Sequence, residues 1–226
     1  TRQGIAFEPH ARVLRQSWQE ALRATGSGGS GHETLRIGIQ HDLVGSDIGD
    51  WIRRFQEVLP DTNFYVEPDY SVQMCTDLER GGLDFAVLFS PRTHPDLHLE
   101  SLGEITYDMV STVAETLDEV ETETYFVANY SPAFSHQHEM LLPRLATSRL
   151  TIGQDAAISG LIRTLGGTAY VLTETAQDLV TAGTAHLVTG APKIPQSVYV
   201  VQPIRQRHRP SHLRLVRMLR EQFQLK

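Results

Sequence analysis

The feature that most constrains this chain is the stretch from Thr34 to Phe89, where strand patterns and helix patterns alternate. Apolar, β-branched runs are typical of buried strands, and amphipathic runs are typical of surface helices. The strand, helix, strand, helix and strand candidates are residues 34–39, 47–59, 63–67, 71–80 and 83–89. Such alternation predicts a parallel sheet with helices on both faces, which binds ligands at the carboxyl ends of its strands. The stretch therefore predicts a small-molecule binding protein.

The rest of the chain predicts a second unit of the same kind. Residues 97–102 and 107–113 are two further strand candidates, and an acidic connection follows at 115–123. Strand and helix candidates then alternate at 125–128, 154–165, 168–172, 174–181, 185–188 and 197–201, before a final helix at 210–223. Two α/β lobes joined by strands imply a cleft between them, where ligand pockets commonly form.

A separate helix is predicted ahead of these lobes, over residues 1–24. Its apolar side chains recur at intervals of three and four residues and form one stripe: Phe7, Ala11, Leu14, Trp18 and Leu22. Such a narrow stripe favours packing on a partner helix, although packing on the chain's own lobes stays open. The Gly/Ser-rich residues that follow predict a flexible linker over 25–33.

Composition excludes several classes of function. The net charge of −7 argues against this segment alone binding nucleic acid, and a single cysteine excludes an internal disulfide. No apolar run is long enough to cross a membrane. The single cysteine favours a reducing environment, so we expect a cytoplasmic protein. His136 and His138 are too few for a metal site, and we expect solvated loop histidines, no metal and no cofactor.

Polar residues at the strand ends are the candidate ligand contacts. Gln40 and His41 follow the first strand, and Ser46 and Ser71 precede helices. Each serine is either a plain helix cap or part of an anion site, because helix N-termini carry free N–H groups and partial positive charge. An enzyme is a third possibility, and its only candidate pair is His41 with Asp42 or Asp69.

Several short motifs, in this order, resemble the LysR-type transcriptional regulators. Thr1-Arg-Gln-Gly4 resembles the end of the family's winged helix-turn-helix domain, and the helix after it resembles the linker helix. Leu35-Arg-Ile-Gly38 and Gly81-Gly-Leu-Asp84 resemble parts of the effector-binding domain, as does Leu165-Gly166-Gly167. The chain departs from the family pattern at Thr168 and Thr173, where glycine and proline are usual.

The resemblance implies a two-lobed, type 2 periplasmic-binding-protein fold of the α/β class, preceded by a linker helix. It implies a first lobe over 34–112, completed by 203–226, and a second lobe over 113–202. It also implies that the DNA-reading domain precedes residue 1 and that the helix at 1–24 pairs two subunits.

The function that the resemblance implies is that of an effector-sensing module rather than an enzyme. The expected effector is a small molecule in the cleft, and an anion is weakly favoured. Promoter DNA is expected to bind through the absent domain, and the full protein is expected to form a homodimer or homotetramer. A stand-alone solute-binding protein of a transporter is the alternative. The family's cleft positions correspond here to Gln40, His41, Ser46, Tyr70, Ser71, Ser90, Asn129, Gly153, Gln154 and Thr168.

Overall fold

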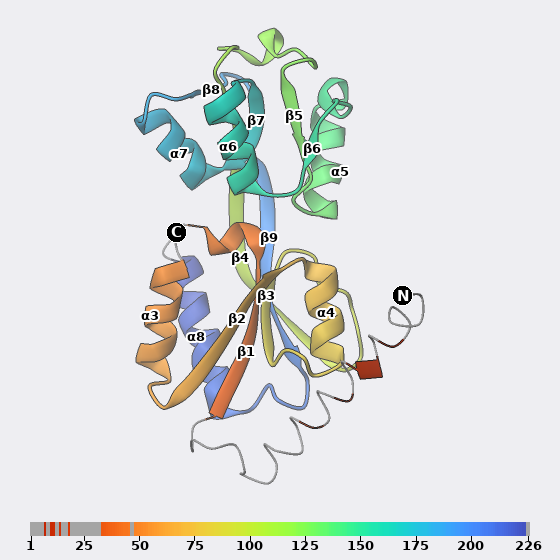
Figure 1. Ribbon diagram of the computed structural model, residues 1–226, viewed down its shortest axis with the longest axis vertical. Coiled ribbons are helices and arrows are strands. Elements are labelled where there is room, and N and C mark those ends of the chain that lie inside the picture. Colours follow the sequence, from red (N-terminus) through yellow and green to blue (C-terminus); the bar gives the residue numbers. More distant parts are fainter. Residues whose placement is uncertain are drawn as a thin grey trace.

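The chain forms two lobes joined by a pair of long strands, as the computed structural model shows (Figure 1). The structure describes residues 33–45 and 48–224, together with residues 7, 10, 11, 14 and 18. These five isolated residues are helical, and Phe7, Leu14 and Trp18 among them are exposed. The remainder of the predicted linker helix and the 25–32 part of the predicted linker lie outside the described residues.

The described residues hold one nine-stranded sheet that runs through both lobes. Its strands are β1 (Glu33–Gln40), β2 (Thr62–Asp69), β3 (Phe85–Leu88), β4 (Leu97–Ser111), β5 (Tyr125–Ala128), β6 (Thr151–Ile152), β7 (Thr168–Leu172), β8 (His186–Leu187) and β9 (Ile194–Pro203). The order is β2-β1-β3-β9-β4-β7-β5-β6, and β8 pairs with β4. Parallel strands flank a central antiparallel pair, β4 and β9, which crosses from lobe to lobe.

Helices cover both faces of the sheet in each lobe (Figure 1). They are α2 (His41–Val44), α3 (Ile48–Val58), α4 (Ser71–Glu79), α5 (Pro132–Leu141), α6 (Asp155–Leu165), α7 (Thr173–Thr181) and α8 (Pro210–Gln224). Two 3-10 turns, η1 (Leu117–Glu119) and η2 (Pro143–Leu145), lie in the second lobe. The alternating strands and helices of the first stretch thus form as the sequence predicts, because their apolar faces all meet the sheet.

Each lobe has its own buried core. In the first lobe, α3 and α8 pack Phe55 and Leu219 on one face of the sheet, while α4 packs Met74 on the other. The second lobe has a separate cluster around Tyr107 and Phe134. The division of the chain at residues 112 and 202 stays a prediction, since the two crossing strands contribute side chains to both lobes.

Two local predictions were wrong. The strand candidates at 97–102 and 107–113 are one continuous strand, β4, in which Gly103 sits at a register shift with a φ of 147°. A positive φ suits glycine, which here makes a bulge rather than a strand end. The second error concerns α5, which the sequence analysis did not predict: His138 lies on this helix, buried, and not on a solvated loop. Its Nε2 lies 2.6 Å from the Tyr125 hydroxyl, and burial lowers its pKa.

No helix in the described part of the chain is long and apolar enough to cross a membrane.

Candidate functional site

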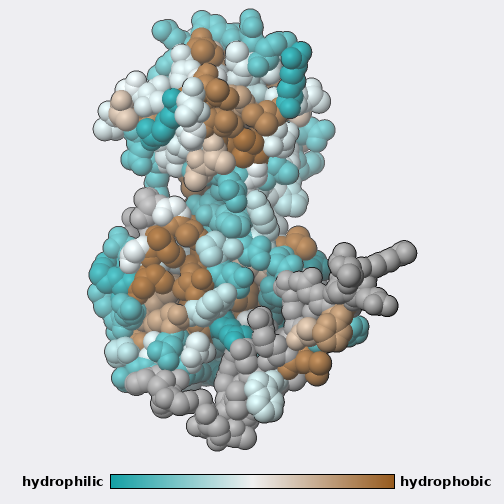
Figure 2. All heavy atoms as spheres, viewed as in Figure 1, coloured by the Kyte–Doolittle hydropathy of each residue, from teal (hydrophilic) through white to brown (hydrophobic). Residues whose placement is uncertain are grey.

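A pocket of about 660 Å³ lies between the lobes. The space-filling view shows the lobes as separate bulges joined by a narrow, mostly hydrophilic waist (Figure 2). The first lobe supplies α2, α3 and the end of α8, the second supplies the starts of α6 and α7, and β4 forms the back. The volume lies within the usual range for small-molecule sites, so the pocket is the principal candidate site.

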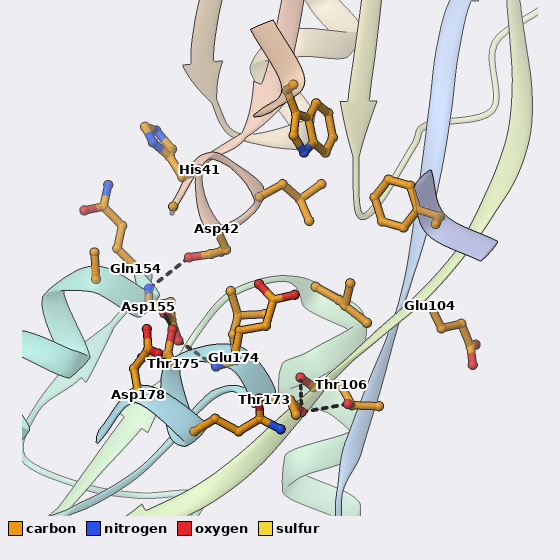
Figure 3. Close-up of a pocket in the computed structure, with 18 of the residues that line it drawn as sticks. His41, Asp42, Glu104, Thr106, Gln154, Asp155, Thr173, Glu174, Thr175 and Asp178 are labelled. Atoms are coloured by element: carbon orange, nitrogen blue, oxygen red, sulfur yellow. Dashed lines mark hydrogen bonds between the residues drawn. The ribbon is translucent and has the colours of Figure 1, made fainter. Parts of the chain in front are cut away.

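One hydrogen bond joins the two lobes inside this pocket. The backbone N–H of Asp155, at the start of α6, donates to Asp42 Oδ1 of α2 over 2.9 Å (Figure 3). Asp155 is itself held within its lobe, because its carboxylate accepts the Leu172 N–H at 2.7 Å and the Thr175 hydroxyl at 2.6 Å. A carboxylate at a helix N-terminus is favourable, so Asp42 acts as an external cap for α6.

The second oxygen of Asp42 has no such partner. Asp42 is only 6 % exposed, and its Oδ2 makes no hydrogen bond with the residues that the structure describes. Burial raises the pKa of Asp42 to about 7 and also raises the pKa of Asp155. The inter-lobe contact therefore combines a satisfied hydrogen bond with a buried, unsatisfied carboxyl oxygen.

The second-lobe wall of the pocket is acidic. Glu174 and Asp178 of α7 line it beside Asp155, and the described lining residues include no lysine or arginine. Glu104 belongs to the lining as well, but its carboxylate points away from the cavity (Figure 3) and accepts a hydrogen bond from Ser197.

The first-lobe wall is largely apolar. Trp51 of α3 and Phe223 of α8 line it, with their ring centroids 6.1 Å apart and their planes nearly perpendicular. Leu43 and Ile105 extend this surface. The pocket thus offers one face to an apolar group and the opposite face to a polar or charged group.

Three of the predicted site residues form a buried polar network at the carboxyl ends of β1 and β3. The Ser71 hydroxyl donates to Gln40 Oε1 at 2.8 Å and accepts the N–H groups of Phe89 and Ser90 at 3.3 and 3.2 Å. Ser71 is therefore not a plain helix cap, since α4 begins after Tyr70 and has no side-chain cap. Its hydroxyl holds the loop after β3 against the end of β1.

Four others meet across the lobes. The His41 and Tyr70 rings lie 4.9 Å apart. A side chain at Gly153 would come within 3.5 Å of the Tyr70 hydroxyl and 3.3 Å of the Asn129 carbonyl oxygen, so glycine permits this close approach. The carboxylates of Asp42 and Asp69, proposed as partners of His41, instead accept the N–H groups of Asp155 and Tyr70.

The remaining three predicted site residues belong to neither of these two groups. Gln154 precedes α6 and lines the pocket. Thr168 is buried at the other end of β7 from the pocket residue Leu172, and its hydroxyl lies 2.7 Å from that of Ser111. Ser46 lies outside the described residues.

Sequence reasoning missed the residues that join the lobes. Asp42 entered only as a partner for His41, and Asp155 was not considered. An aspartate in the first turn of a predicted helix signals a favourable helix end, but nothing in one sequence shows that Asp42 and Asp155 meet.

A second missed link lies at the crossing strands. Ser131 accepts the Phe134 N–H at 3.0 Å, capping α5, and donates to Gln196 Oε1 of β9. Gln196 Nε2 donates to the Phe89 carbonyl oxygen at 3.5 Å. Gln196, buried on the crossing strand β9, thus bridges a helix of the second lobe and a loop of the first.

The described residues contain no group of three or more His, Cys, Asp and Glu side chains arranged to hold a metal ion.

Comparison with known families and structures supports this reading of the fold. The family described as "LysR substrate binding domain" matches residues 28–224. No curated protein matches the chain.

Three solved structures illustrate the likeness. The reduced regulatory domain of OxyR2 from Vibrio vulnificus is 14 % identical, with a TM-score of 0.69 over 84 % of this chain and 95 % of that one. The regulatory domain of MexT, a transcriptional activator in Pseudomonas aeruginosa, is 16 % identical, with a TM-score of 0.67 over 84 % and 99 %. Full-length LysG from Corynebacterium glutamicum with bound effector Arg is 16 % identical, with a TM-score of 0.65 over 98 % and 78 %. All three share the two-lobed fold.

Proposed function

Because the chain belongs to the LysR substrate-binding-domain family, we propose that it senses a small molecule in the pocket between its lobes. It is an effector-binding regulatory domain of the type 2 periplasmic-binding-protein-like fold, and a transporter's solute-binding protein is not favoured. The family is one of transcription regulators, which are not typically enzymes.

The pocket carries this proposal. It is lined by both lobes, and a ligand that touches both favours the arrangement in which they are close. A ligand can shift such an equilibrium only by its difference in affinity for the two arrangements. Contacts to α6 and α7 on one side and α2 on the other supply that difference. Among the predicted contacts, His41 and Gln154 line the pocket, whereas Gln40, Tyr70, Ser71, Ser90, Asn129 and Gly153 are not among its lining residues.

The wider assembly is part of the same proposal. We infer that the chain acts in the cytoplasm, pairs with a second copy through the stripe that includes Phe7, Leu14 and Trp18, and reaches promoter DNA through another domain. The exposure of these three helical side chains supports an apolar stripe available for packing.

A pair of alanines on α6 provides the test. Ala156 lines the pocket, whereas the exposed Ala157 beside it does not. The melting temperature is measured with carboxylates, amino acids, sugars, aromatic acids and amines, since a ligand that binds the folded state alone raises it. We expect a shift with one chemical class that Ala156→Phe abolishes by filling the pocket and that Ala157→Phe retains. A shift that survives Ala156→Phe would place the effector elsewhere.

A further inference from the structure

The charge of the pocket is one-sided. Asp42 reaches it from the first lobe, and Asp155, Glu174 and Asp178 reach it from the second (Figure 3). No lysine or arginine occurs among the described lining residues, and His41 is the sole basic side chain among them. Like charges that face each other across a gap repel, so they disfavour close lobes unless something neutralises them.

Asp42 supplies an independent indication of a ligand. Buried polar atoms in folded proteins almost always have hydrogen-bond partners, and an orphaned one needs an explanation. Asp42 is 94 % shielded from solvent, it lines the pocket, and its Oδ2 has no hydrogen-bond partner among the described residues. Its carboxyl group points from α2 toward the second lobe (Figure 3). A buried acceptor without a partner in the wall of a cavity fits a donor brought by a ligand.

We propose that the pocket binds an organic cation, a primary ammonium group carried on an apolar body. This rests on the proposed function and names the chemical class of its effector. An ammonium group has three donors and no acceptor, which suits a wall of carboxylates. Placed at Asp42 Oδ2 and within reach of α7, it contacts both lobes at once. It thereby neutralises the repulsion that disfavours their approach.

The apolar wall fits the remainder of such a ligand. Trp51 and Phe223 present aromatic surface opposite the acidic wall, and Leu43 and Ile105 extend it. Apolar atoms gain by leaving water there, and aromatic faces also attract cations. The volume of about 660 Å³ accommodates a ligand with a single aromatic ring.

This class differs from the anion that the helix N-termini of Ser46 and Ser71 suggested. The Ser71 hydroxyl is already engaged by Gln40 and by the N–H groups of Phe89 and Ser90. The start of α6 is likewise occupied, because the Asp155 N–H donates to Asp42. At α4 the Ser71 hydroxyl, and at α6 the Asp155 N–H, are therefore already bonded within the protein.

Matched probes of opposite charge test the proposal. Titration calorimetry at constant ionic strength compares 2-phenylethylammonium with 3-phenylpropionate, and butylammonium with pentanoate. We expect at least one ammonium to bind and its carboxylate partner not to bind. Asp42→Asn, which keeps an acceptor for the Asp155 N–H, should weaken ammonium binding about tenfold or more, as for a lost charge-assisted contact. Asp118→Asn, an exposed position on η1, should leave it unchanged.

The outcomes distinguish the proposal of a cationic effector from the broader proposal that the pocket senses a small molecule. Carboxylate binding that Ala156→Phe abolishes would overturn the cation and leave a sensor with an anionic effector. Ammonium binding that Asp42→Asn leaves intact would also overturn the proposal. If neither ammonium binds, the proposal of a cationic effector is wrong. If, in addition, Ala156→Phe abolishes the binding of no compound in the earlier panel, the proposed sensor function is wrong as well.

Discussion

Asp42 gives the folded chain a pH dependence whose sign is unusual for an aspartate. Burial raises its pKa to about 7, so the folded state holds this proton more tightly than the unfolded state. The stabilising contribution is complete below about pH 4 and is lost as pH rises to 7. One pKa unit corresponds to about 1.4 kcal/mol, which makes the effect a few kcal/mol at most. Asp42→Asn should flatten this slope in urea denaturation between pH 4 and 8.

Other charged and polar groups near Asp42 also affect how stability depends on pH, so the experiment needs a control. Asp155 from α6, Glu174 from α7 and His41 from α2 all share its pocket, and the pKa of Asp155 is also raised. The variant should therefore remove part of the slope and leave the share of Asp155. Asp118→Asn should keep the full slope, because that side chain is exposed. Parallel slopes in wild type and Asp42→Asn would show that Asp42 does not titrate in this range.

Individual side chains also show where sequence reasoning stops. The polar residues Gln40, Ser71 and Ser90 were predicted as ligand contacts, and in the structure their hydrogen bonds join them to one another. Asp42 and Asp155 meet across 113 positions of chain. No local pattern encodes that contact, because it depends on how the second lobe is oriented on the first.

Ser131, at the start of helix α5, also contacts the crossing strand β9. Ser131 caps the helix and donates to Gln196 of β9, so Ser131→Ala removes a cap and leaves a buried amide oxygen unpaired. Together these losses should lower the free energy of unfolding by about 2 to 3 kcal/mol. Ser135→Ala, on the same helix, removes a hydroxyl that donates to Asn129 and should cost under about 1 kcal/mol. Equal losses in chemical denaturation would show that the Gln196 contact contributes nothing.

Elements with regular patterns were predicted well, and irregular ones were not. The helices α3, α4, α6, α7 and α8 follow their apolar periodicity. In α5 the buried face includes His138, a residue that breaks an apolar pattern, and the helix was missed. In β4 the glycine at the bulge looked like a break between two strands. Both errors arise because tertiary contacts override local preference.

The described residues form separate buried cores in the two lobes, which predicts two levels of stability. Leu219 is fully buried in the first-lobe cluster that includes residues of β1 and α3, whereas Leu213 on the same helix is half exposed. Leu219→Ala should destabilise the first lobe by about 2 to 5 kcal/mol, and Leu213→Ala by much less. Hydrogen exchange should show faster opening of β1 and β3 in Leu219→Ala, with protection in β5 and β7 largely kept. Uniform loss of protection would show that the lobes open as one unit.

The course of the chain through the two lobes has a consequence for its synthesis on the ribosome. The second lobe lies between β4 and β9, while α8, which completes the first lobe, is the last described element to be made. The core of the nascent first lobe therefore stays incomplete, with Trp51 and Phe55 lacking their α8 neighbours, until Leu215 and Leu219 emerge from the ribosome. The lobe that begins first is completed last, which reverses the usual order in which domains fold during translation.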